Sequence, residues 1–241
     1  MFELVKARLR HGYQAIPDPL LAQINPAFPG CPTLAADADL QALAALCPTG
    51  AFSGKGLDLG KCTFCGACQR KYPKMIDFKP DFRLAADSRE ALIVAPGTQY
   101  VAKIAPHEIK LFRRSFAIRN VSAGGCNACE LELGASTNVN FDMGRYGVEI
   151  VASPRHADAL ILTGPISRNM ADALADTWEA IPAPKCLILC GCCAISGGVF
   201  APSAQLDRSF LAHWPASIYI PGCPAHPLSI VHAIHSFMGV K

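Results

Sequence analysis

After residue 115 the chain alternates between short apolar runs and stretches with helical spacing of apolar residues. The runs are bounded by turn-forming residues and predict strands, while the stretches between them predict helices. This alternation is typical of a parallel sheet with helices on its faces. The predicted strands cover residues 115–121, 148–152, 159–164, 186–190 and 217–222, and the clearest predicted helices cover 167–181 and 225–238.

The first 80 residues follow a different pattern, rich in Pro and Gly and with only short periodic segments. Residues 44–62 predict a helix end, a short hairpin and then a loop that contains cysteine. Residues 81–111 are expected to be a connector with one apolar run. We therefore predict a small α+β domain at 1–80, a connector at 81–111 and an α/β domain at 112–241.

Composition suggests that much of the surface is covered, either by a partner or by tight packing. Hydrophobic residues make up 51% of the chain and charged residues 17%, against about 25% charged in typical domains. A net charge of +3 is too small to indicate nucleic-acid binding. The apolar stretch 187–202 is too short to span a bilayer, and the charged start of the chain does not predict a signal peptide.

The twelve cysteines are the most informative feature of the composition. Without a secretion signal, metal ligation is favoured over disulfides. Four of them follow predicted strands: Cys126 and Cys129 the first, Cys193 the fourth and Cys223 the fifth. Sites of open parallel sheets lie beyond the carboxyl ends of the strands, so we expect these four to form one site.

A second set of cysteines has the spacing of two-cluster bacterial ferredoxins. Those proteins carry the pattern C-x2-C-x2-C-x3-C-P twice, and the fourth cysteine of each run ligates the other cluster. Residues 61–73 keep the first three cysteines but have Tyr72 at the fourth position, before the expected Pro73. Upstream, Cys47 precedes a proline as a fourth cysteine would. Residues 28–80 thus resemble a bacterial-type ferredoxin domain, which implies one 4Fe-4S cluster held by Cys47, Cys62, Cys65 and Cys68.

The other ferredoxin cluster is expected to be absent, because all four of its ligand positions hold other residues: Asp37, Leu40, Leu43 and Tyr72. Leu40 and Leu43 share a predicted helix face with Leu46, so apolar side chains can fill the space. A structural zinc ion is an alternative occupant of the remaining site, since four thiolates also suit zinc. Cys31 fits no ligand position and is expected to be a buried thiol.

Residues 112–239 closely resemble the small, cluster-bearing subunit shared by energy-converting membrane-bound NiFe-hydrogenases and respiratory complex I. The resemblance is carried by AGGCNACELE at 123–132, by 151–170, by CGCCAISGGVF at 190–200 and by IYIPGCPAHP at 218–227. It implies a flavodoxin-like parallel sheet and a second 4Fe-4S cluster held by Cys126, Cys129, Cys193 and Cys223.

Within that group the first cysteine pair is similar to the hydrogenase form. Two residues separate Cys126 from Cys129, as in small subunits of the formate-hydrogenlyase type, whereas complex I subunits carry adjacent cysteines. Cys192 is expected to point away from the cluster, because consecutive residues leaving a strand face opposite sides. Cys186 and Cys190 are expected to lie in the core.

The resemblance implies an electron-transfer subunit of an oxidoreductase complex, with no complete active site in this chain. Its partners would be a catalytic large subunit and membrane-anchoring subunits, and the chain would lie peripherally on the cytoplasmic side of the membrane. A complex-I-like assembly that reduces quinone or another acceptor is the main alternative. A zinc-stabilised interaction module is a remote one. The roles of Arg155, His156 and Asp158 stay open at this stage.

Overall fold

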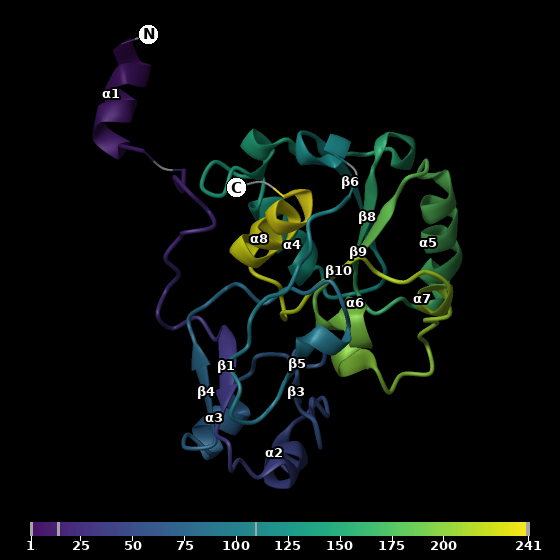
Figure 1. The fold of residues 1–241 in the computed structure, drawn as a ribbon. Coiled ribbons are helices and arrows are strands. Elements are labelled where there is room, and N and C mark those ends of the chain that lie inside the picture. The colour runs from purple at the N-terminus through teal and green to yellow at the C-terminus, as the bar shows by residue number, and fades with distance from the viewer. Residues whose placement is uncertain (1, 14, 109, 240–241) are drawn as a thin grey trace.

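The predicted parallel sheet is present and has five strands (Figure 1). The computed structural model describes residues 2–13, 15–108 and 110–239. The strand order β10-β9-β8-β6-β7 places the second strand of the domain at one edge, which is the flavodoxin-like order. All neighbouring strands run parallel, as the alternating pattern predicts. The strands are β6 (Phe116–Ser122), β7 (Val148–Ile150), β8 (Ala159–Thr163), β9 (Cys186–Cys190) and β10 (Ile218–Ile220).

Helices cover the two faces of this sheet (Figure 1). Alternate residues of the central strands enter different cores: Leu160 and Leu187 pack on the side of α5, whereas Ile161 and Ile188 pack on the side of α8. Because both faces are buried, β8 and β9 are buried throughout and apolar at every position except Thr163. The helices of this half are α4 (Ala128–Ala135), α5 (Arg168–Ala180), α6 (Cys192–Ser196), α7 (Phe210–His213) and α8 (Pro227–Met238), with short 3-10 turns η2 (Lys110–Arg113), η3 (Met143–Tyr146), η4 (Pro154–His156) and η5 (Gly198–Phe200).

The N-terminal half contains two small antiparallel sheets. One pairs β1 (Cys31–Leu34) with β4 (Ile76–Lys79), and the other has the order β2-β3-β5. The expected hairpin is β2 (Phe52–Ser53) with β3 (Gly56–Asp58). Its third strand, β5 (Ile93–Val94), comes from the predicted connector, directly after η1 (Glu90–Leu92). The remaining helices of this half are α2 (Leu40–Leu46) and α3 (Ala67–Lys71). The division of the chain at residues 80 and 111 stays a prediction.

One face of α2 fills the region where a second ferredoxin cluster would have its ligands. Leu43 is completely buried, and Leu40 and Tyr72 pack against the same core. Leu46, which was expected on this face, instead has 38% of its surface exposed because α2 ends there. The buried side chains explain how this half keeps a core without those cysteines.

The chain begins with α1 (Phe2–His11), which extends away from the rest of the molecule and has no buried residue (Figure 1). Among the described residues, no helix is long and apolar enough to cross a membrane.

Backbone pairing joins the two halves of the molecule. The amide of Ala86 donates to the carbonyl of Tyr219 at 3.0 Å, and the amide of Tyr219 donates back at 2.8 Å. Tyr219 lies on β10, so the segment between β4 and β5 continues the main sheet by one antiparallel bridge.

A salt bridge joins the end of β3 to Arg89, which directly precedes η1. Arg89 donates through both arms of its guanidinium to the carboxylate of Asp58, with one N–O distance of 2.7 Å. Only 29% and 15% of the two side chains are exposed, so water screens this pair poorly. Asp58 also accepts a hydrogen bond from the amide of Gly60, just before the first cysteine loop.

Replacing Asp58 by Ala should lower the midpoint of thermal unfolding by about 5 °C, which corresponds to the loss of about 2 kcal/mol. The reason is that Arg89 would lose its charged partner while half-buried. Glu3→Ala is the matched control, because the Glu3–Lys6 pair is exposed and should contribute almost nothing. Equal midpoints for the two variants would contradict this account.

Candidate functional site

The four cysteines of the ferredoxin-like motif line one pocket. Cys47 follows α2, Cys62 and Cys65 lie in the loop after β3, and Cys68 lies on α3. Phe52 and Phe78 complete the wall of the pocket. The structure thus brings together all four sulfur ligands that the sequence predicts for the first cluster.

Backbone amides point at two of these sulfurs. The amide of Phe64 donates to Cys62 Sγ and the amide of Ala51 donates to Cys47 Sγ, each at 3.3 Å. Burial raises the pKa of Cys62 to about 12, so its thiolate needs a positive partner such as iron. Four thiols with amide donors are the ligand set that an iron–sulfur cluster uses. The residues present therefore fit a cluster at this place.

The second cysteine set lies at the carboxyl edge of the parallel sheet, as predicted. Cys129 on α4, Cys193 on α6 and Cys223 after β10 lie close enough to influence one another electrostatically. Cys126 lies exposed in the loop before α4, three residues before Cys129. The structure thus assembles three of the four predicted ligands and leaves the fourth on the adjoining loop.

Two glycines make room for the sulfurs at this edge. A Cβ added at Gly191 would lie 2.5 Å from Cys129 Sγ, and one added at Gly198 would lie 2.8 Å from Cys193 Sγ. Both glycines also have positive φ, 89° and 54°, which a residue with a side chain rarely adopts. These positions need glycine for space as well as for backbone conformation. A cradle lined by sulfur and bare backbone fits a bulky inorganic group.

Among the described residues, no group of three or more His, Cys, Asp or Glu side chains lies in an arrangement suited to a single metal ion.

The prediction that Cys192 points away from the other cysteines is wrong. Its thiol hydrogen-bonds to both Cys193 and Cys223. The alternation rule for strands does not apply, because α6 begins at Cys192 and consecutive helical residues are only about 100° apart. Cys190 is fully buried, as expected, but its thiol also contacts Cys129. Cys31 and Cys186 are buried thiols, as predicted, and burial raises the pKa of each to about 11.

Arg208 is a supporting residue that the sequence analysis did not find. Its guanidinium donates to the carbonyls of Pro165, Cys193, Ala194 and Ile195 at 2.7–3.1 Å. It therefore satisfies the carbonyl groups of α6 directly behind Cys193, and its charge also helps to lower the pKa of Cys193, after the hydrogen bond from Cys192. No sequence motif marks this arginine, because it lies far along the chain from the cysteine.

Two acidic residues have structural partners at opposite ends of the sheet. Glu130, directly after Cys129, accepts a hydrogen bond from the buried Thr163 hydroxyl at 2.7 Å. Asp158 accepts one from the amide of Ala117 at 2.8 Å, which ties the start of β8 to β6. Arg155 and His156 are exposed and precede the start of β8, away from the carboxyl ends of the strands that the second cysteine set follows.

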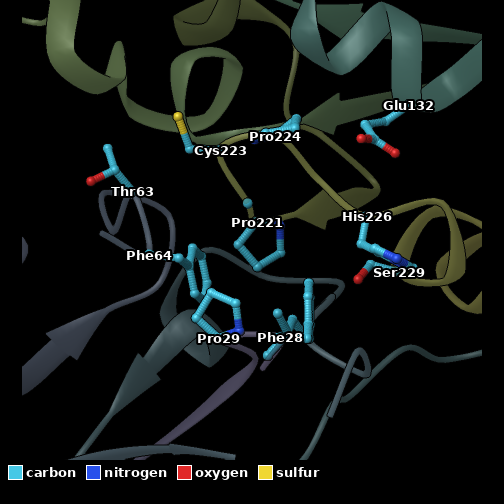
Figure 2. A pocket seen from close by; sticks show the side chains of 12 residues that line it. Phe28, Pro29, Thr63, Phe64, Glu132, Pro221, Cys223, Pro224, His226 and Ser229 are labelled. Atoms are coloured by element: carbon cyan, nitrogen blue, oxygen red, sulfur yellow. The ribbon is translucent and has the colours of Figure 1, made fainter. Parts of the chain in front are cut away.

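A cavity of about 250 Å³ lies between the two cysteine sites (Figure 2). Thr63 and Phe64 of the first cysteine loop line it, as do Cys223 and Pro224 of the second. Phe28 and Pro29 close it from the N-terminal side. The two predicted clusters would therefore be neighbours within one chain.

Comparison with known proteins identifies the family. Residues 126–237 match the family described as the 20 kDa subunit of NADH ubiquinone oxidoreductase. A probable membrane-bound hydrogenase subunit, mbhJ, of Pyrococcus furiosus is 37% identical over 129 residues, which cover 52% of this chain and 75% of that subunit. The chain belongs to this family.

Other members of the family come from complexes of different kinds. Formate hydrogenlyase subunit 7 of Escherichia coli is 35% identical over 140 residues, 58% of this chain and 55% of that protein. NADH-quinone oxidoreductase subunit 6 of Thermus thermophilus is 39% identical over 111 residues, 46% of this chain and 61% of that protein. The chain thus spans little more than half of the length of these two relatives. The matches confirm the resemblance of residues 112–239 to the small-subunit family.

Arg208→Ala should remove iron from the second site while leaving the first intact. The four carbonyls would lose their donor, which costs about 1–3 kcal/mol for each group left buried without a partner. Cys193 would then be held less firmly. Iron and sulfide content together with the thermal midpoint measure the effect, and Arg168→Ala, at an exposed arginine, is the control. Full iron content in Arg208→Ala would show that this arginine does not support the site.

Proposed function

We propose that the chain is the electron-transfer subunit of a membrane-bound hydrogenase complex and carries two 4Fe-4S clusters. Electrons would pass between an external donor or acceptor, the first cluster, the second cluster and a NiFe site in a partner large subunit. The first cluster would be held by Cys47, Cys62, Cys65 and Cys68, and the second by Cys126, Cys129, Cys193 and Cys223. Such clusters carry out one-electron chemistry, with a potential set by burial and by hydrogen bonds to sulfur.

The observation that carries this proposal is that two cysteine sets line neighbouring places in one fold. The first set surrounds a single pocket, and the loops of both sets line the cavity of Figure 2. A second contact lies nearby: a Cβ added at Gly60 would lie 2.6 Å from Ile195 Cγ2. Gly60 lies two residues before Cys62 and Ile195 two residues after Cys193, so the chain holds the two sites together at two points.

The large subunit would cover the exposed side of the second site. Cys126 and Cys223 are exposed there, and Leu131 has 67% of its surface exposed on the adjoining helix. A cluster held at such an edge needs a cover, because its potential depends on exclusion of water. Further partner subunits would anchor the assembly, which would place the chain peripherally on the cytoplasmic side of the membrane.

A complex-I-like oxidoreductase that reduces quinone is the second candidate function. The similarity to NADH-quinone oxidoreductase subunit 6 favours it. The hydrogenase proposal is preferred because the C-x2-C spacing of Cys126 and Cys129 is similar to the hydrogenase form. Hydrogen-dependent dye reduction by the purified complex, compared with its quinone reduction, separates the two.

The purified chain should contain about eight iron and eight sulfide per molecule, as two cubane clusters require. The matching spectrum is a broad visible absorption that dithionite bleaches. Zinc in place of iron, with no visible absorption, would support the zinc-stabilised module instead. About twelve iron atoms would mean that a further cluster exists.

Cys65→Ser should halve the iron content and remove one of two electron paramagnetic resonance signals. Cys31→Ser, a change at a buried thiol outside the motif, should leave both signals in place. The pair of variants tests ligand assignment separately from general damage to the fold. Loss of a signal in Cys31→Ser, with retention in Cys65→Ser, would overturn the assignment of the first cluster.

A further inference from the structure

Two thiols that belong to neither proposed ligand set lie against the second one. Cys190 ends β9 and Cys192 begins α6, with Gly191 between them. Both are buried, with 0% and 1% of their surface exposed, so their S–H groups have no access to water. A buried S–H group must find its partner within the protein.

The partners of these thiols are ligand sulfurs. Cys192 hydrogen-bonds to Cys193 and Cys223, and Cys190 hydrogen-bonds to Cys129. The positions agree with the contacts of Gly198, whose added Cβ would lie 2.8 Å from Cys193 Sγ and 3.2 Å from Cys192 Sγ. The sulfurs of residues 192 and 193 thus lie on the same side of the chain.

The backbone holds Cys192 in this position. The amide of Cys192 donates to the carbonyl of Gly222 at 2.9 Å, which ties the start of α6 to the loop that carries Cys223. The preceding amide, of Gly191, donates to Ile220 at 2.8 Å. Cys192 is therefore fixed between two ligand-bearing segments by main-chain contacts that do not depend on its own side chain.

We propose that Cys192 and Cys190 are hydrogen-bond donors to the ligand sulfurs of the second cluster and raise its reduction potential. The inference rests on the proposed function, since it requires a cluster at this site. Reduction adds negative charge to the cluster, and a donor to a ligand sulfur stabilises the more negative state. Each thiol keeps its proton and donates a hydrogen bond to a ligand thiolate, so neither binds iron. They are positioning residues that act through Cys193, Cys223 and Cys129.

The test is a redox titration of the purified complex, followed by electron paramagnetic resonance, with wild type and Cys192→Ala. The variant should keep its full iron content but have a lower potential for the second cluster. A tenfold change in the equilibrium constant for its one-electron reduction corresponds to about 59 mV. The first cluster is an internal reference and should not shift. Cys192→Ser, which keeps a donor, should restore much of the wild-type potential.

Cys186→Ala is the matched control for loss of a buried thiol. Cys186 lies on the same strand as Cys190 but hydrogen-bonds to Ser217 rather than to a ligand. This variant should leave the potential unchanged, while Cys190→Ala should lower it as Cys192→Ala does. A shift in Cys186→Ala equal to that in Cys192→Ala would overturn the inference, because packing alone would then account for it.

Other outcomes separate this inference from the proposed function. Loss of the second signal in Cys192→Ala, with retention in Cys193→Ala, would make Cys192 the ligand in place of Cys193. That result would overturn the inference and the assignment of Cys193, but it would leave the proposal of two clusters in place. An unchanged potential in Cys192→Ala with full iron content would also overturn the inference and leave the two-cluster proposal in place. Wild-type protein without a second 4Fe-4S signal would overturn both.

Discussion

The arrangement of the second cysteine site depends on one close approach between backbone and sulfur. Cys129 Sγ occupies the space where a side chain of residue 191 would lie, so α4 can pack against the end of β9 only if that residue is glycine. The turn at Gly191 also directs Cys190 toward Cys129, and it directs Cys192 toward Cys193 and Cys223. A single glycine, Gly191, therefore sets the distance between α4 and β9 and the directions of the Cys190 and Cys192 thiols. The parallel sheet provides the edge, and this turn determines which sulfurs meet there.

The two halves of the molecule are coupled near their cysteines rather than at their distant surfaces. Asp58 and Arg89 brace the hairpin before the first cysteine loop, and Arg208 braces α6 behind Cys193. Gly60 and Ile195 touch between them. Because the braces and the contact lie within a few residues of the cysteines, relative motion of the halves is restricted where electron transfer would be most sensitive to distance.

The sequence predicts the main sheet well, because apolar runs such as Ala159–Leu162 and Cys186–Cys190 occur where both faces of a sheet are covered. It also predicts that the four cysteines of the first set share a pocket, since their spacing is a local property. It fails at Cys192, where a rule for strands was applied to the first residue of a helix. Arg208 and the pairing of β5 with β3 escape prediction because they depend on contacts between residues far apart in the sequence.

The pairing of Ala86 with Tyr219 has a consequence for how the protein behaves on its own. β10 is the last strand of the main sheet, and its outer N–H and C=O groups would otherwise be open to any extended chain. Such unpaired edges are templates for edge-to-edge aggregation. The segment around Ala86 pairs with Tyr219, the middle residue of β10, and so protects this edge from other extended chains. A C-terminal half without this segment would expose the edge of β10, so the N-terminal half protects the main sheet from aggregation whether or not it carries electrons.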